Sequence, residues 1–288
     1  TGSGTGNISE ALSSSNATPT VVTYVVVSTA NGCSNTGENV TVTVQPVPVV
    51  NVVSNQTLCN GASTTAVSFS GVATQYNWTN DTPSIGLAAS GVGNIPSFTS
   101  LNPTTNPVTA TITITPVYNG CTGTTTTFTI TVNPTPVLTS TLTPSAICSG
   151  TSFSYTPTSA TGGTTYAWTR ASVVGISQAA GSGTGVINET LTNTTVLPLS
   201  VVYNIVSTAN GCSNGGQNVV VTVYPTPLLS STLTATAICS GATFGYTPTS
   251  ATTGTTFAWT RAAVGGISPA TGSGTGNISE ALSSSNAT

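Results

Sequence analysis

Apolar residues alternate with Thr, Ser and Asn over short stretches along the whole chain. Between residues 137 and 225 these stretches are separated by Gly, Asn and Ser, and they read VLTSTLT, SFSYTPT, TTYAWTRA, GVINETLT, VVYNIVSTA and NVVVTVYP. A period of two is typical of half-buried strands, and no segment has the 3.6-residue period of an amphipathic helix. The pattern therefore predicts an all-β chain.

The sequence repeats at two levels. Residues 1–18 are identical to residues 271–288, an offset of 270. Within that span TSATGGTTYAWTRA, from Thr158, returns as TSATTGTTFAWTRA, from Thr249, an offset of 91. A fixed period of this kind is typical of tandem structural units. We interpret the 270-residue unit as three domains of roughly 90 residues each.

The segments QPVP, NPTP and YPTP mark the expected domain boundaries. Proline is disfavoured inside a strand and stiffens a linker, so it suits a joint between domains. The expected domains are the C-terminal half of one domain at 1–48, complete domains at 49–136 and 137–227, and the N-terminal part of another at 228–288. This division predicts that the sequence is an excerpt of a longer chain.

Each complete domain is expected to hold six or seven short strands, with a Trp on the third. That arrangement is typical of an immunoglobulin-like β-sandwich of about 100 residues. Trp78, Trp168 and Trp259 occupy equivalent positions in the repeats. We expect all three side chains to fill the core between the two sheets. The predicted fold is therefore a tandem array of Ig-like domains.

Three short motifs recur around these Trp residues. They are Cys-x-Gly at Cys59, Cys148 and Cys239, an aromatic residue two positions before each Trp, and Asn-Gly-Cys late in each domain. Together they resemble the PKD-like and related Ig-like repeats of Bacteroidota, and the resemblance extends over the whole chain. The sequence has WTRASVVG where PKD domains proper have Gly-Asp-Gly after the Trp strand. Any role of that turn is therefore not expected here.

The resemblance implies a location and a function. Such repeats occur in very large surface proteins exported by the type IX secretion system, including gliding adhesins and prey-catching fibres. It therefore implies an extracellular, cell-surface protein whose repeats form the shaft of a fibre. Adhesion, surface movement and capture of other cells are the uses that it suggests.

The chain has six cysteines and no His, so metal binding is less expected than disulfide formation, which is typical of extracellular proteins. Two pairing schemes are open. Within single domains, Cys59 would bond to Cys121 and Cys148 to Cys212. Between adjacent domains stacked head to tail, Cys59 would bond to Cys212 instead.

The expected strand order favours the second scheme slightly. In each complete domain the first Cys precedes the second strand and the other follows the turn after a long strand, which places them toward opposite ends of the sandwich. A disulfide requires Cα atoms within about 7 Å, whereas six or seven residues of strand span about 20 Å. In this scheme the partners of Cys33, Cys121, Cys148 and Cys239 lie outside the sequence. An irregular first strand would restore the first scheme, so both remain open.

Charged residues are few and regularly placed. The chain has two Arg, no Lys and five acidic residues. Arg170 and Glu189 are separated by 19 residues, as are Arg261 and Glu280. We expect these to be structural ion pairs. Because an exposed pair stabilises a protein very little, a buried or interface position is expected for them.

The composition excludes several binding functions. Two Arg and no Lys cannot follow a nucleic-acid backbone or an anionic membrane surface. The longest apolar run, Val21–Val27, is too short to span a bilayer. Asp81 alone offers too few oxygen ligands for calcium. We therefore expect no nucleic acid, membrane insertion, metal or cofactor.

Catalysis is not expected either. The many Ser and Thr hydroxyls have no His or Lys to accept their protons. The segment GSGTG at residues 181–185 is interpreted as a Gly-rich turn within a β pattern, and no helix follows it as a phosphate-binding loop requires.

Three functions stay open from the sequence. A fibre shaft is favoured because near-identical repeats present the same surface again and again, which would also let copies of the chain associate in a parallel homo-oligomeric bundle. The second is an adhesin whose repeats themselves bind glycans through weak multivalent contacts. The third is a spacer for another terminal domain. Glycans or other cells would be bound at a tip outside this sequence.

Overall fold

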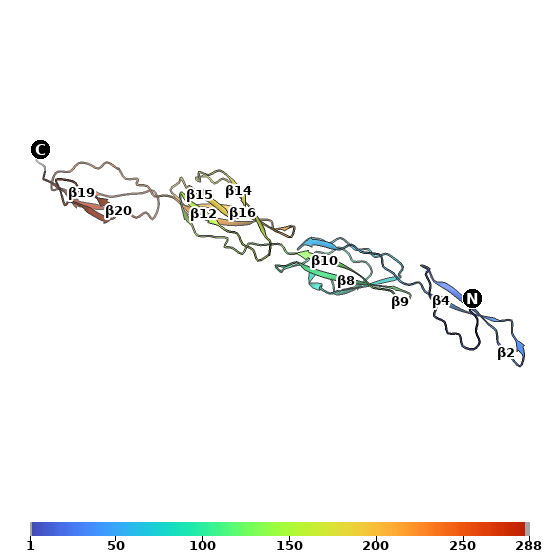
Figure 1. Cartoon of the computed structure of the whole chain (residues 1–288). Coiled ribbons are helices and arrows are strands. Elements are labelled where there is room, and N and C mark those ends of the chain that lie inside the picture. Colours follow the sequence, from blue (N-terminus) through green and yellow to red (C-terminus); the bar gives the residue numbers. More distant parts are fainter. Residues whose placement is uncertain (1, 286–288) are drawn as a thin grey trace. The chain divides into compact units, whose positions relative to one another are not determined.

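The computed structural model describes residues 2–285, which consist mainly of strands and loops (Figure 1). They include one three-residue 3-10 helix, η1 (Pro83–Ile85). The all-β prediction is confirmed. The chain forms two compact units. The first comprises Thr1–Pro136, Thr161–Gly163 and Ala209–Ser213, and the second comprises Val137–Ala160, Thr164–Thr208 and Asn214–Thr288.

Residues 49–136 form a two-layered sandwich. One layer is a sheet in the order β5 (Gln56–Cys59), β10 (Thr126–Asn133), β8 (Val108–Tyr118), β6 (Gln75–Asn80) and β7 (Ser90–Val92), with β9 (Cys121–Thr122) paired to β8. β5 runs parallel to β10, and the other pairs are antiparallel. In the second layer, isolated bridges join Ser63 to Thr99 and Val67 to Ile95.

The next repeat has the same strand order with more regular pairing. Its larger sheet runs β11 (Ile147–Cys148), β18 (Gln217–Tyr224), β16 (Leu199–Ala209), β13 (Thr165–Arg170) and β14 (Gly181–Thr184), and β17 (Cys212–Ser213) pairs with β16. Its smaller sheet pairs β12 (Thr151–Tyr155) with β15 (Ile187–Leu191). Alternate residues of β16 are buried, as the period of two predicts.

The outer segments contain parts of the same pattern. Near the N-terminus β1 (Thr20–Val26) pairs with β4 (Glu38–Val44), and β2 (Thr29–Ala30) pairs with β3 (Cys33–Ser34). Near the C-terminus the strands are β19 (Thr243–Tyr246), β20 (Ala258–Arg261), β21 (Ile267–Ser268), β22 (Gly272–Thr275), β23 (Ile278–Ala281) and β24 (Ser283–Ser284). β19 pairs with β23, β20 with β22, and β21 with β24.

The tryptophans lie where the sandwich layers meet. Trp78 and Trp168 are buried in separate hydrophobic cores, each completed by strand residues of its own repeat. Trp168 packs edge-on against Tyr203, with 5.7 Å between ring centroids. Trp259 is half-buried on β20.

Two expected elements differ in the structure. Val137–Thr143 is not a regular strand, because its backbone bonds partly to side chains: Leu138 N–H donates to Gln217 Oε1 at 2.7 Å. This segment forms one isolated β-bridge, between Leu138 and Ser159. The first regular strand of the repeat is therefore β11. Conversely, Gly181–Thr184 is strand β14 rather than part of a turn.

The Gly residues of β14 make room for two large side chains. Gly183 lies opposite Trp168, and a Cβ added there would sit 2.7 Å from Trp168 Cζ2. A Cβ added at Gly181 would likewise lie 2.6 Å from Glu189 Oε1. Gly274 faces Trp259 and Gly91 faces Trp78 in the other repeats. The repeated GSG is therefore a packing requirement and not a phosphate loop.

Replacing Gly183 by Ala is expected to lower the free energy of unfolding of this repeat by about 1–3 kcal/mol, because the new methyl group overlaps the Trp168 ring. Ser182→Ala on the exposed face of the same strand is the control, with an expected change within about 0.5 kcal/mol. Urea denaturation followed by Trp fluorescence measures both. Equal midpoints for the two variants would contradict this packing role.

Candidate functional site

Within residues 2–285 there is one disulfide, between Cys59 at the end of β5 and Cys212 at the start of β17. The Cα atoms are 5.6 Å apart, and the two residues are 153 positions apart in sequence. The bond joins the expected domain at residues 49–136 to the next expected domain, at residues 137–227. This is the pairing that the sequence slightly favoured, in place of Cys59 with Cys121.

Cys59 is held in place by its own repeat. In the parallel pairing of β5 and β10, Cys59 lies beside Asn133, whose carbonyl accepts a hydrogen bond from Asn60 N–H at 2.8 Å. The hydroxyl of the fully buried Ser100 lies 2.9 Å from the Cys59 carbonyl. These bonds fix the turn after β5 and therefore the direction of the Cys59 side chain.

Cys212 is presented by a tight hairpin. Asn210 and Gly211 connect β16 to β17 with φ of 51° and 77°, the left-handed conformation that Asn-Gly adopts readily in two-residue hairpins. Asn133 Nδ2–H donates to the Asn210 carbonyl at 2.9 Å, beside the disulfide. Cys212 is only 1% exposed. The hairpin tip is thus bound by one hydrogen bond and one covalent bond.

The other cysteines occupy equivalent places. Cys33 and Cys121 follow the same Asn-Gly turn, and Cys148 ends β11 as Cys59 ends β5. Cys33, Cys121, Cys148 and Cys239 are exposed thiols with no disulfide partner among the described residues. The scheme that pairs Cys148 with Cys212 is therefore not the one formed.

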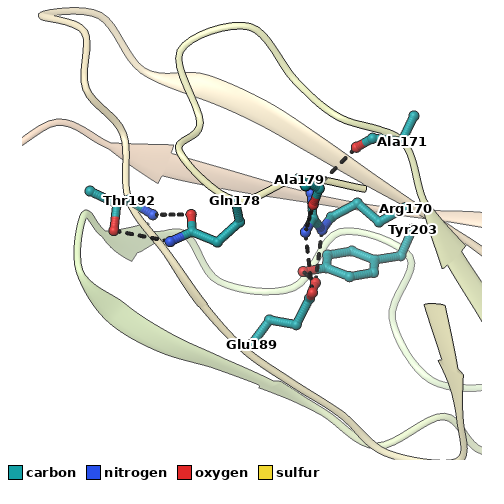
Figure 2. Close-up of polar contacts among 7 residues, drawn as sticks. All are labelled: Arg170, Ala171, Gln178, Ala179, Glu189, Thr192 and Tyr203. Carbon is teal, nitrogen blue, oxygen red and sulfur yellow. Dashed lines mark hydrogen bonds and ion pairs between the residues drawn. The ribbon is translucent and has the colours of Figure 1, made fainter. Parts of the chain in front are cut away.

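A second cluster lies inside the repeat at 137–227 and joins its two sheets (Figure 2). Arg170 at the end of β13 points toward Glu189 on β15, with Nε to Oε2 at 2.8 Å and Nη2 to Oε1 at 3.1 Å. Tyr203 on β16, directly beside Arg170, donates its hydroxyl to the same Oε2 at 2.6 Å. Nη2 also donates to the Ala179 carbonyl at 2.7 Å, and Nη1 donates to the Ala171 carbonyl at 3.4 Å.

Burial and hydrogen bonding set the charges of this cluster. The Arg170 side chain is 1% exposed and that of Glu189 is 20% exposed. Hydrogen bonding to Glu189 raises the pKa of Arg170. Burial by itself would raise the pKa of Glu189, but the hydrogen bonds from Arg170 and Tyr203 outweigh it and hold that pKa below its usual value. Burial, followed by the bond to Glu189, raises the pKa of Tyr203.

These shifts predict how stability depends on pH. Folding lowers the pKa of Glu189. The carboxylate's contribution to folding stability is therefore fully present above the usual pKa of 4.5 and is lost as pH falls through the folded-state pKa. Because folding raises the pKa of Tyr203, its contribution is complete below 10.0 and is lost at higher pH. Thermal unfolding of the chain and of Glu189→Gln at pH 3 and pH 7 tests the acid limb. The variant is expected to lose less on acidification, and an equal loss would contradict the assignment.

Parts of the same cluster occur in the outer segments. Arg261 Nε lies 3.0 Å from Glu280 Oε2, and Tyr24 donates its hydroxyl to Glu10 Oε2 at 2.8 Å. In the repeat at 49–136, Asn80 takes the place of Arg170 and bonds to the carbonyls of Leu87 and Ala88. The Ig-like fold thus forms here both with and without a buried ion pair.

Among residues 2–285 no group of three or more His, Cys, Asp and Glu could hold a metal ion. In the same part of the chain no helix is long and apolar enough to cross a membrane. Asp81 has a local structural role: its carboxylate accepts a hydrogen bond from Thr111 N–H at 2.8 Å, which lowers its pKa.

Sequence reasoning missed several residues that build these sites. Tyr203, Ser100 and Asn133 act through contacts between strands far apart in sequence, so no local pattern marked them. Asn193 is another: its side chain donates to the carbonyls of Leu197 and Val223 and ties a loop to β18. For Tyr203 one signal existed, since Glu10 and Tyr24 recur 179 residues later as Glu189 and Tyr203.

Comparison with known proteins gives one family match. Residues 145–227 match the PKD-like domain family. Solved structures similar to the chain include a three-domain titin I67–I69 variant (13% identity, 83% of this chain and 89% of that chain, TM-score 0.40). Another is Sidekick-1 immunoglobulin domains 1–5 (12% identity, 91% and 68%, TM-score 0.34). No curated protein sequence matches the chain.

The strand order and the family match agree for the repeat at 137–227. Its sheets have the layers of an Ig-like sandwich, and the PKD-like match covers β11 through β18. Domains of this type are typically non-catalytic structural or adhesion modules. The protein is therefore a tandem array of Ig-like β-sandwich domains, in which residues 145–227 are similar to the PKD-like domain family.

Proposed function

We propose that this chain is part of the shaft of a long extracellular fibre at a cell surface, used for adhesion, surface movement or capture of other cells. The observation that carries the proposal is the Cys59–Cys212 disulfide, which joins successive repeats covalently. A bond of this kind resists separation of repeats under tension, whereas a module that only binds a ligand has no need of it. The role is structural and non-catalytic.

The same joint is proposed for the neighbouring repeats. Asn119 corresponds to Asn210, and Gln45 precedes its Pro as Asn133 does. Asn119 Nδ2–H donates to Gln45 Oε1 at 3.4 Å, so equivalent residues are in contact, although in the stapled joint it is Asn133 Nδ2–H that donates, to the Asn210 carbonyl. Cys121 follows Asn119 as Cys212 follows Asn210. We therefore assign Cys33, Cys121, Cys148 and Cys239 partners in repeats outside this sequence.

The export route and the partner follow from the resemblance and the composition. Export by type IX secretion is proposed from the resemblance of the repeats to Bacteroidota surface repeats, and the PKD-like match supports only the domain type in that resemblance. With two basic and five acidic residues, copies of the chain repel one another very little. Apolar side chains are also exposed on the outer surface, Val174 at 95% and Leu197 at 58%. A parallel bundle of identical chains is the assembly that these features favour.

Antibodies raised against residues 137–227 test the proposal on the producing cells. Gold-labelled antibody is expected along the full length of filaments sheared from the surface, because a shaft repeats its epitope. Antibody against an unrelated surface protein is the control. Label confined to filament tips would favour the adhesin alternative, and label absent from filaments would overturn the fibre proposal.

A further inference from the structure

The disulfide encloses most of two domains in a covalent loop. The loop begins at Cys59, at the end of β5, which is the first strand of the repeat at 49–136. It ends at Cys212, just before β18, which is the last strand of the next repeat. Every strand from β6 to β16 lies inside the loop, while β5 and β18 lie outside it. The loop therefore contains the bodies of both sandwiches.

We infer that the disulfide is a bypass for mechanical tension, which carries load from Cys59 directly to Cys212 and removes residues 60–211 from the load path. The biological use of this bypass rests on the proposed fibre function, but the covalent topology does not. Tension applied to the two ends of the chain follows the shortest covalent route. That route crosses the sulfur–sulfur bond and never enters the enclosed residues.

Strand geometry shows what the bypass changes. β5 is parallel to β10, from Gln56 beside Ile130 to Cys59 beside Asn133. Without the disulfide, tension enters this domain through β5 and leaves through β10, so the two strands are pulled in opposite directions and their hydrogen bonds are sheared. With the disulfide, β5 is stretched along its own axis and β10 carries no load. The domain is then no longer pulled apart.

The same change applies to the repeat at 137–227. Its first strand, β11, is parallel to β18, with Ile147 beside Val223 and Cys148 beside Tyr224. Under the bypass, load enters at Cys212 and leaves along β18, so β11 and the strands up to β16 carry none. Trp168 and Tyr203 of this core lie on enclosed strands, whereas Val219, Val221 and Val223 lie on β18, outside the loop.

The joint itself is built to persist. Cys212 is 1% exposed, and access of an attacking thiolate is one of the factors that control disulfide reduction. The hydrogen bond from Asn133 to the Asn210 carbonyl holds the hairpin tip beside the sulfur atoms. Ser100 fixes the turn that follows Cys59. The bypass is therefore expected to remain closed under oxidising conditions.

The closed disulfide also keeps the contour length of the enclosed residues from contributing to extension. The bonded residues are 153 positions apart, and an extended residue spans about 3.3–3.6 Å, so opening the disulfide releases roughly 500–550 Å of chain once the domains unfold. With the disulfide closed, unfolding of either enclosed domain adds none of this length. In a fibre in which Cys121 and Cys148 are bonded to other repeats as proposed above, residues 121–148 would carry part of the load, and the array would be nearly inextensible until its disulfides are reduced.

Single-molecule stretching of the whole 288-residue chain, held by handles at its two ends, tests the inference. The compared variants are Cys59→Ser/Cys212→Ser and the matched control Cys121→Ser/Cys148→Ser, which removes two exposed thiols of the same repeats. The unchanged chain and the control are expected to reach a full extension about 500 Å shorter than the first variant. Equal extensions for all three would overturn the inference.

A second measurement needs no variant and so does not depend on folding of a mutant. A dithiol is added while the unchanged chain is held under tension; it gives two electrons to the disulfide and closes to its own cyclic disulfide, leaving thiols on Cys59 and Cys212. A lengthening of about 500 Å is expected after reduction. A chain whose Cys59 and Cys212 thiols are shown by alkylation to be free, and that still shows no lengthening at a force that unfolds the domains, overturns the bypass. The fibre proposal is decided by the filament labelling alone.

Discussion

Replacing Arg170 by Met is expected to lower the free energy of unfolding of the repeat at 137–227 by about 3–5 kcal/mol. The change removes a nearly fully buried cation and leaves the Glu189 carboxylate, only 20% exposed, without its charged partner. Removing one member of a buried ion pair costs more than the pair contributes, because the remaining charge stays desolvated. Hydrogen–deuterium exchange of β16 peptides measures the loss, with β8 peptides of the other repeat as an internal reference.

The double variant Arg170→Met/Glu189→Leu is the control for that prediction. With both charges replaced by apolar groups, no carboxylate is left desolvated, and most of the lost stability is expected to return. The repeat at 49–136 already forms its sandwich with Asn80 in the place of Arg170. If the single variant loses no more stability than the double variant, Glu189 is solvated in solution and the buried pair described above is wrong.

Replacing Cys59 by Ser is expected to lower the free energy of unfolding of the two enclosed domains by about 4–5 kcal/mol. In the chain-entropy account, a disulfide stabilises by restricting the unfolded chain, and the effect grows with the enclosed length. Here the bonded residues are 153 positions apart. Guanidinium denaturation under non-reducing conditions measures the difference between the chain and the variant.

Cys121→Ser is the matched control, because it removes an exposed thiol that has no disulfide partner among residues 2–285. Its expected effect is within about 0.5 kcal/mol. A Cys59→Ser variant with the midpoint of this control would mean that the disulfide does not stabilise the array.

Much of the fold follows from local patterns. The alternation in VVYNIVSTA places alternate side chains in the core, and β16 has that burial pattern. The 19-residue spacing of Arg170 and Glu189 indicates an ion pair, and the structure brings their side chains together between two sheets. The Asn-Gly dipeptide predicts a tight hairpin, and Asn210 has the positive φ that such a turn requires.

Other features depend on contacts that no local pattern encodes. Gly183 belongs to a strand because the Trp168 ring occupies the space of its missing side chain, so a segment with turn composition became β14. Leu138 belongs to an irregular segment because Gln217, from the far end of the repeat, supplies its hydrogen bond. Cys59 and Cys212 lie in different repeats, so their pairing required an assumption about how repeats follow one another.

The proposed shaft depends on a disulfide that joins successive repeats. Non-reducing digestion of the protein isolated from its natural source, followed by mass spectrometry of the linked peptides, tests it most directly. The peptides are distinguishable, since QTLCNG contains Cys59, ANGCSNGG contains Cys212 and YNGCTGT contains Cys121. A linked pair of QTLCNG with ANGCSNGG is the predicted result. A linked pair of QTLCNG with YNGCTGT would confine the bond to one domain and contradict the account.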